Sequence, residues 1–198
     1  MQSIAKVRDF FIADTHFGHT NVIKHCDRPF RDVIEMEKAF ISDWNSRVSN
    51  TDRVFVLGDF SFYDWYETQN LLKRLNGQKF LVKGNHDSMK MLKKTTAFAK
   101  IETYHEQNYE LDNGEVIRVC LSHFPFLSWH QMHRGAYHFH GHCHGSLELP
   151  DKLKQARIFD VGVDNLAKVF GAYAPVTLEQ LVEHLSDRKK ATVDHHAV

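Results

Sequence analysis

Three short apolar segments in the first half of the chain each end in a polar turn, and this pattern limits the fold more than any other feature. The segments are residues 8–13, 53–57 and 79–82, and they end in Asp14, in Gly58-Asp59, and in Gly84-Asn85-His86-Asp87. Short apolar runs bounded by turn residues are typical of buried strands. We therefore expect three strands whose carboxyl ends carry polar side chains.

The segments between these strands have helical periodicity. Residues 33–48 place apolar side chains three to four positions apart, which predicts an amphipathic helix. Residues 64–76 predict a second helix, with Gly77 as its stop. Strands that alternate with helices predict an α/β fold with parallel strands.

The second half of the chain is richer in strands. Residues 104–111 and 115–122 flank Asp112-Asn113-Gly114, a strong hairpin signal. Residues 137–140 and 157–163 predict further strands, and Thr177 with Gln180 forms a capping box for a helix that reaches about Leu185. We therefore expect a single domain over residues 1–186 with mixed sheets, followed by a polar, flexible tail over residues 187–198.

Charge and cysteine content exclude several classes of protein. The 25 Lys and Arg balance the 25 Asp and Glu, so no overall charge marks the chain for nucleic acid or for an anionic membrane. Cys26, Cys120 and Cys143 are odd in number and widely spaced, which predicts no disulfide framework and a reducing compartment. The N-terminal residues resemble neither a signal peptide nor a membrane span, so we expect a cytoplasmic protein without membrane partners.

The chain has 15 histidines, and several lie with acidic residues at the expected strand ends. Polar groups at the carboxyl ends of parallel strands meet at one edge of a sheet. The residue types are those that bind metals: Asp14 and His16, Asp59, Asn85, His123, and His142 and His144. Two divalent cations about 3.5–4 Å apart need a shared anionic ligand, and imidazoles suit Mn²⁺, Fe or Zn²⁺. The sequence therefore predicts a site for two metal ions.

Five of these segments together resemble the calcineurin-like metallophosphoesterase family, and most closely its small bacterial and phage-type members. They are DTH at 14–16, GD at 58–59, GNHD at 84–87, SH at 122–123 and GHCH at 141–144, in the order that the family has them. The resemblance implies two mixed β-sheets packed as a sandwich and flanked by helices. Many members have an acidic residue soon after GD, whereas here the next one is Asp64.

The resemblance also implies roles for individual residues. One metal ion would be held by Asp14, His16, Asp59 and His144. The other would share Asp59 as the bridge and add Asn85, His123 and His142. His86 would be the catalytic histidine, with Asp87 orienting its ring.

Four further residues are candidates for binding the substrate. His19 and Asn21 either line the substrate side of the first loop or only fix its conformation. Arg28, before Pro29, is either a bidentate phosphate clamp or an ordinary turn arginine. His133, with Trp129 and Arg134 beside it, either contacts the leaving group or packs at the surface.

The predicted activity is hydrolysis of phosphomonoesters or phosphodiesters by a hydroxide that bridges two divalent metal ions, with Mn²⁺ favoured and Fe, Zn²⁺ or Ni²⁺ as alternatives. Small phosphoesters, nucleotides or oligonucleotide ends fit the neutral charge and the short chain. One alternative is a nuclease that tracks nucleic acid through Lys90, Lys93 and Lys94, which would share one face of a helix directly after residues 84–87. Another is a non-catalytic scaffold of the same fold. The sequence leaves the oligomeric state open.

Overall fold

The structure is a computed structural model that describes residues 6–92 and 94–193. Its elements, in chain order, are β1 (Asp9–Ile12), α1 (Thr20–His25), α2 (Val33–Arg47), β2 (Arg53–Val56), α3 (Trp65–Arg74), β3 (Gln78–Val82), α4 (Met89–Leu92), β4 (Phe98–Glu102), β5 (His105–Glu110), β6 (Val116–Leu121), the 3₁₀ turn η1 (Met132–Arg134), β7 (Tyr137–His140), the 3₁₀ turn η2 (Asp151–Leu153), β8 (Ile158–Asp160), α5 (Val163–Phe170), β9 (Val176–Thr177) and α6 (Leu178–His184).

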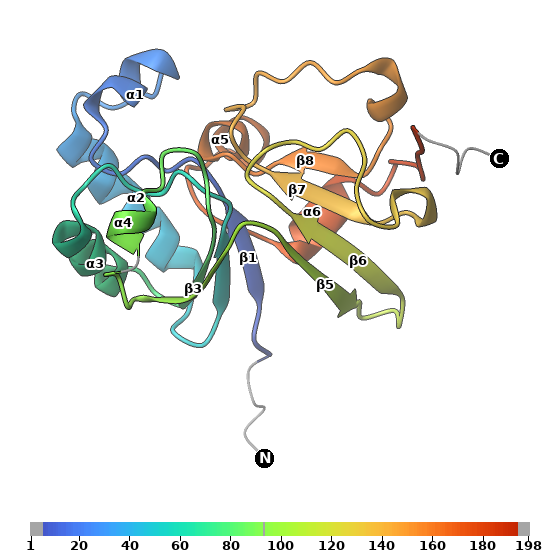
Figure 1. Ribbon diagram of the computed structural model, residues 1–198, viewed down its shortest axis with the longest axis horizontal. Helices are drawn as coiled ribbons and strands as arrows, with labels where there is room; N and C mark the ends of the chain where they lie inside the picture. Colours follow the sequence, from blue (N-terminus) through green and yellow to red (C-terminus); the bar gives the residue numbers. More distant parts are fainter. Residues whose placement is uncertain (1–5, 93, 194–198) are drawn as a thin grey trace.

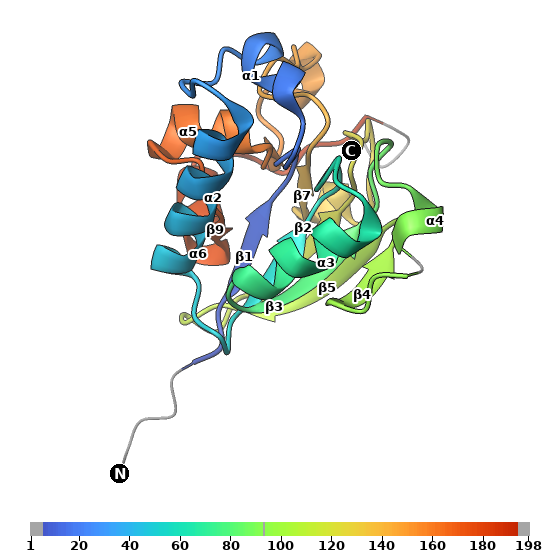
Figure 2. The ribbon, with the colours of Figure 1, turned by 90° about the vertical axis from the view of Figure 1, so that its left-hand side faces the viewer.

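The strands form two mixed sheets. The first has the order β4-β3-β2-β1-β9, with β9 antiparallel to the other four, and the second has the order β5-β6-β7-β8, with only the β5–β6 pair antiparallel. Figure 1 shows the second sheet on the right and α2, α3 and α4 to the left of the first sheet. In Figure 2, α2, α5 and α6 form a column along one side. This arrangement confirms the expected α/β fold with two mixed sheets and flanking helices.

The two sheets meet in an aromatic and aliphatic core. The ring of Phe11 in β1 lies edge-on to Phe139 in β7, with centroids 5.2 Å apart, and it stacks on Phe55 in β2 at 5.5 Å. Phe11 and Phe139 are fully buried. Since the contact joins one strand from each sheet, it fixes the strand ends of both sheets relative to one another.

The predicted helices form where the periodicity places them. In α2 the apolar positions Met36, Phe40 and Trp44 are buried, and the Asp32 carboxylate caps the helix by accepting from the N–H groups of Ile34 and Glu35. Asp64 caps α3 through a capping box with Glu67. The acidic residue after GD is therefore a helix cap.

The second predicted capping box is also present. Thr177 and Gln180 cap α6, and the hairpin predicted around residues 112–114 joins β5 to β6.

Four helices and strands were not predicted, namely α1, β4, α5 and β9, and neither were the 3₁₀ turns η1 and η2. The predicted strand over 157–163 was wrong at its end, because β8 stops at Asp160 and Val163 starts α5. Sequence periodicity missed this change because residues 161–163 are all buried, and a continuous buried run has no helical or strand pattern.

The described part of the expected tail, residues 187–193, continues along the second sheet. The N–H of Lys189 donates to the carbonyl of Gln155 at 2.8 Å, and Ala191 and Val193 pack against a small cluster around Trp129. Residues 194–198 lie outside the described part of the chain. Within the described part, no helix has the length and apolar character needed to cross a membrane.

Candidate metal centre

The polar turns that follow the strands meet at one edge of the two sheets. In Figure 1, β1 runs upward from the N-terminal side towards α1, and the turn after it lies at this edge. A cleft of about 800 Å³ opens there, and its lining includes His16, His19, His86, His142 and His144. The structure thus brings side chains from residues far apart in sequence to a single cleft.

One group of predicted ligands lies around Asp14. Ligand atoms of Asp14, His16 and His144 all lie within 4.8 Å of one another. The Nε2 atom of His16 is 3.8 Å from Oδ2 of Asp59. These four residues are the set that the resemblance implied for the first metal ion.

The other predicted ligands converge on the side chain of Asn85. Its Oδ1 atom lies 2.8 Å from Nε2 of His123 and 3.1 Å from Nδ1 of His142. The same Nε2 atom of His123 lies 3.5 Å from Oδ2 of Asp59. One oxygen of Asp59 therefore faces His16 on one side and His123 on the other, as a bridging carboxylate would.

Unpartnered buried atoms show that these residues fit a metal ion. Oδ1 of Asp14 and both ring nitrogens of His16 are buried without a hydrogen-bond partner, which is costly unless a ligand supplies one. Burial raises the pKa of Asp14 well above its usual range and lowers the pKa of His16 to about 2. His16 is therefore neutral, which is the form that binds metals, and a cation would restore the charge of Asp14.

Neighbouring groups orient two of the histidines. The Nδ1 atom of His123 lies 2.8 Å from the carbonyl of Leu57, so Nδ1–H donates there and Nε2 faces Asp59 and Asn85. His144 places its Nδ1 atom 2.7 Å from Oδ2 of Asp164. A carboxylate behind a histidine is the usual way to fix the tautomer of a metal ligand.

Asp164 was missed by the sequence reasoning. Burial lowers the pKa of His144, but the hydrogen bonds with Asp164 and Cys26 and the charge of Asp14 outweigh it and raise that pKa to about 10. Asp164 lies in α5, an element that the sequence did not predict, and no motif marks it.

The backbone at the centre is strained. Asp14, His16, Asp59, His142 and His144 have φ values between 49° and 71°, in the left-handed region that disfavours side chains with a Cβ. Such conformations cost about 1–3 kcal/mol each and persist where the surrounding structure enforces them, often at functional sites. Five of the seven predicted ligands share this conformation.

One glycine of the predicted turns is required by close packing. A Cβ atom at Gly84 would overlap the Asp59 carboxylate and the backbone at Asp59. The turns after β2 and β3 can approach one another only because this position has no side chain.

His86 lies at the cleft, but Asp87 does not orient it. The N–H of His86 donates to Oδ1 of Asp59 at 2.8 Å, and its ring lies 5.8 Å from that of His16. The buried Asp87 carboxylate instead accepts from the N–H groups of Gly84, Asp59 and Phe60 at 2.8–3.1 Å. In place of the predicted contact with the His86 ring, the Asp87 carboxylate ties the turn after β3 to the turn after β2.

Arg28 does not fit the predicted phosphate clamp. Its side chain is completely buried and makes a two-point pair with Asp164, at 2.7 and 2.9 Å. It also donates to the carbonyls of Thr15 and Asp14 at 3.0 and 2.8 Å. Because its charge and donors are used inside the protein, Arg28 supports the metal centre from behind.

His19 and Asn21 differ in their position. His19 lines the cleft and stacks on Phe62, with centroids 4.1 Å apart and the planes inclined by 10°. Its Nδ1 atom is buried without a partner. Asn21 is exposed in α1 and is not among the residues that line the cleft.

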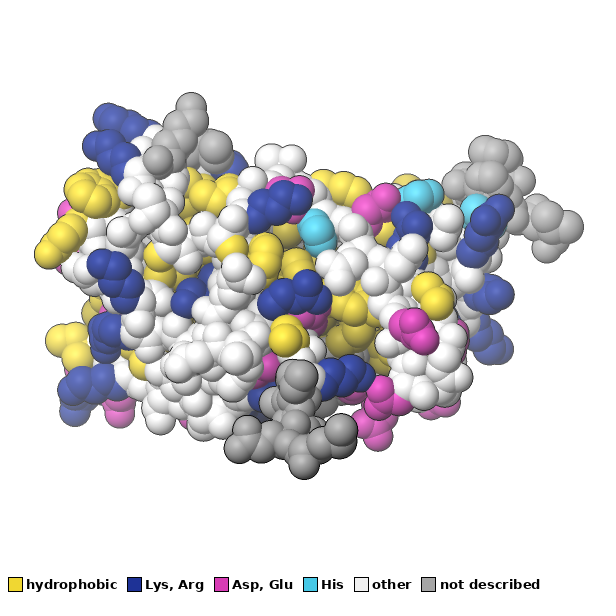
Figure 3. All heavy atoms as spheres, turned by 90° about the horizontal axis from the view of Figure 1, so that it is seen from below, with side chains coloured by type: hydrophobic (Ala, Val, Ile, Leu, Met, Phe, Trp, Pro, Cys, Tyr) yellow, Lys and Arg dark blue, Asp and Glu magenta, His cyan; other side chains and the backbone are white. Residues whose placement is uncertain are grey.

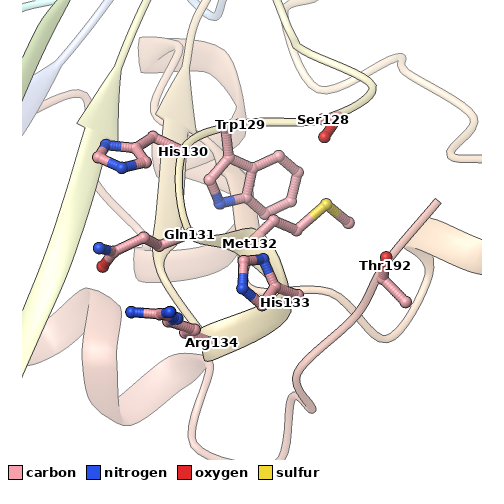
Figure 4. Close-up of a pocket in the computed structure, with 8 residues that line it drawn as sticks. All are labelled: Ser128, Trp129, His130, Gln131, Met132, His133, Arg134 and Thr192. Carbon is pink, nitrogen blue, oxygen red and sulfur yellow. The ribbon is translucent and has the colours of Figure 1, made fainter. Parts of the chain in front are cut away.

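His133 lies in a different hollow. His133 lines a hollow of about 330 Å³ together with Trp129, Met132, Arg134 and Thr192. Figure 4 shows its ring next to Met132. The described residues of this lining include none of the seven predicted ligands. His133 is therefore not among the residues that line the cleft at the metal centre, and its contact with a leaving group stays a prediction.

Comparison with known proteins identifies the chain. The family model described as calcineurin-like phosphoesterase matches residues 10–197. The chain belongs to the calcineurin-like phosphoesterase family. Membership supports a metal-dependent phosphoester hydrolase in general, and the clustered Asp and His side chains agree with the metal dependence.

Relatives of this calcineurin-like phosphoesterase include an archaeal protein and a phage protein. The uncharacterized protein MJ1445 of Methanocaldococcus jannaschii is 33% identical and covers 91% of this chain and 92% of its own length. The Gene 66 protein of Mycobacterium phage L5 is 27% identical, over 78% of this chain and 86% of its own.

A solved structure supports the fold. The crystal structure of AQ665 from Aquifex aeolicus, a protein of unknown function, is 25% identical and has a TM-score of 0.65; the match covers 90% of this chain and all of that one.

Proposed function

We propose that this chain is a binuclear metal-dependent phosphoesterase that hydrolyses small phosphomonoesters or phosphodiesters. The observation that carries the proposal is the position of Asp59. Its Oδ2 atom lies 3.8 Å from Nε2 of His16 and 3.5 Å from Nε2 of His123, between two sets of ligands. A single carboxylate oxygen shared by two histidine-containing sets is what a pair of divalent cations requires.

The predicted ligands form two sets, one for each metal ion. Asp14, His16, Asp59 and His144 would hold one ion, and Asp59, Asn85, His123 and His142 the other. When bound, the ions neutralise phosphate charge and lower the pKa of water at the site. The mixture of carboxylate, amide and imidazole ligands favours Mn²⁺, with Fe, Zn²⁺ and Ni²⁺ as alternatives.

His86 is the candidate donor of the proton that the leaving oxygen needs. Its ring lies in the cleft beside His16, while its backbone N–H is held by Asp59. An imidazole placed there would donate a proton to the departing alkoxide. Because water is the nucleophile, no covalent intermediate with the protein is required.

A metal-dependent hydrolysis assay tests this proposal. The metal-free protein is supplied with Mn²⁺, Ni²⁺, Mg²⁺ or Zn²⁺ and assayed with p-nitrophenyl phosphate and bis-p-nitrophenyl phosphate. We expect turnover that requires added metal and that Asp14→Asn abolishes. A scaffold of the same fold would show no turnover of either ester with any of these metals, and that result would overturn the proposal.

A further inference from the structure

An exposed aromatic ring lies directly against the candidate proton donor. Phe62 is 42% exposed although three histidine rings surround it. Its centroid lies 5.1 Å from that of His86, 5.3 Å from that of His16 and 4.1 Å from that of His19. Single exposed apolar side chains are common on proteins. Phe62 is not itself among the residues that line the cleft, but its ring lies against that of His86, which does line it.

The backbone fixes the position of Phe62. Its N–H donates to the carbonyl of Phe17 at 2.8 Å, and the N–H of Phe17 donates to the carbonyl of Phe60 at 3.0 Å. The turn after β2 is thereby joined to the turn after β1, which carries His16. His19 stacks on the Phe62 ring with nearly parallel planes, so the ring is held from the side as well.

A second exposed aromatic ring lies on the opposite group of ligands. Phe124 is 48% exposed and lies edge-on to His142 at 4.6 Å and to His123 at 5.0 Å. The two phenylalanines therefore belong to different sides of the centre. Of the two, Phe62 is the one that lies beside His86, where the leaving group would depart.

We infer that Phe62 is a specificity-determining residue that stacks on a flat aromatic ring of the leaving group, so that the preferred substrate class is nucleotides. This inference rests on the proposed function. In the reaction, the oxygen of a water molecule bonds to phosphorus and the bond from phosphorus to the 5′-oxygen breaks. A proton from protonated His86 ends on the 5′-oxygen, the water loses a proton to solvent, and His86 regains one from solvent. Stacking of a base on an aromatic side chain tolerates any base, because every base has a π-face.

A matched pair of substrates isolates the contribution of the base. Adenosine 5′-monophosphate and ribose 5-phosphate release the same type of primary alkoxide and differ in the adenine. If the wild-type protein hydrolyses only diesters, the methyl esters of both compounds replace them. We expect kcat/KM for the adenosine compound to exceed that for the ribose compound by about 5- to 150-fold, the range of one stacking contact.

Variants then locate the contact. Phe62→Leu should reduce the adenosine preference by about fivefold or more and change kcat/KM for the ribose compound less than about twofold. Phe62→Tyr should keep the preference, because it keeps the ring. Phe124→Leu is the matched control and should leave the ratio unchanged. Metal content and thermal melting show that each variant is folded and loaded.

The outcomes separate this inference from the proposed function. If the wild-type protein hydrolyses neither pair nor the p-nitrophenyl esters with any metal, the proposed function fails and the inference fails with it. If the wild-type protein hydrolyses the adenosine compound and the ribose compound with equal kcat/KM, the inference is overturned while the proposed function stands. The same holds if Phe124→Leu rather than Phe62→Leu removes the preference for the adenosine compound.

Discussion

Neighbouring residues at the centre have different tasks, and Asn85 and His86 are the clearest pair. The Oδ1 atom of Asn85 lies between ring nitrogens of His123 and His142, whereas His86 contacts the centre through its backbone N–H. The amide is placed among ligands, and the imidazole is placed in the cleft.

We therefore expect substitutions at these two adjacent residues to differ in their effect on metal content. Asn85→Ala should lower metal content and activity together. His86→Ala should keep the metal content and lower kcat by about 10²- to 10⁴-fold on esters with a poor leaving group. The loss should be smaller for p-nitrophenyl esters, because p-nitrophenolate departs with little help. Metal analysis of both variants beside steady-state kinetics on alkyl and aryl esters makes the comparison.

Two results would refute the acid role of His86. One is loss of metal from His86→Ala. The other is an equal decrease in kcat for good and poor leaving groups.

Motifs in the sequence were sufficient to predict which residues gather at the centre, but not which residues lie behind them. Asp14, His16, Asp59, Asn85, His123, His142 and His144 stand at strand ends and in recognisable motifs, and the structure brings them together. Arg28 looked like a phosphate clamp because its partner Asp164 is 136 positions away. A bond between such distant residues leaves no local signal, so only the fold reveals it.

At the scale of elements, strong periodicity and turn chemistry were the reliable signals. The helix α2 and the β5–β6 hairpin carry them and were predicted. Three of the missed helices and strands are short or lie at an edge: α1 has 6 residues, β9 has 2, and β4 is the edge strand of its sheet. The fourth, α5, has 8 residues and follows a continuous buried run that hides its start. The conformation of such elements depends on tertiary pairing, which local sequence does not encode.

The junction between β1 and β2 depends on one buried carboxylate. Asp52 accepts from the backbone N–H and from Nη2 of Arg8 at 3.0 and 2.8 Å, and from the N–H of Ser49 at 2.8 Å. Burial raises the pKa of Asp52, but these hydrogen bonds outweigh it and hold that pKa below its ordinary value. The stabilisation is therefore fully present above the unfolded pKa of about 3.9 and is lost as pH falls through the folded value.

Asp52→Asn should remove this contribution. We expect the free energy of unfolding at pH 7 to fall by about 1–3 kcal/mol, and the variant to lose less stability than the wild type between pH 7 and pH 3. Urea denaturation at both pH values measures this. Asp151→Asn, at a carboxylate that is 93% exposed, is the control. Parallel losses of stability in wild type and Asp52→Asn would contradict the assignment.

At the scale of the whole molecule, charge distribution bears on the nuclease alternative. Figure 3 shows the face seen from below in the orientation of Figure 1, away from the edge that carries the metal centre, and basic and acidic side chains are interspersed on it. Of the three lysines that the sequence singled out, Lys90 and Lys94 are exposed, and Lys93 lies outside the described residues. The helix predicted to carry them ends at Leu92, so Lys94 is not on it; its Nζ lies 5.9 Å from the ring centroid of Trp65.

Reversing the charge of these two lysines tests whether they bind the phosphate backbone of a nucleic acid. In Lys90→Glu/Lys94→Glu we expect oligonucleotide turnover and its dependence on salt to change little, because a neutral protein working on small esters needs no such path. Kinetics between 50 and 200 mM salt, roughly the range over which phosphate contacts weaken, provide the comparison. A large loss that depends on salt would favour the nuclease.

The number of metal ions per chain tests the central claim most directly. After loading with Mn²⁺ and removal of free metal, elemental analysis of the wild type should find about two ions per chain. Asp59→Asn should lower that number, because it removes the charge of the carboxylate that lies between the two ligand sets. A single tightly bound ion in the wild type, retained unchanged in Asp59→Asn, would contradict the account.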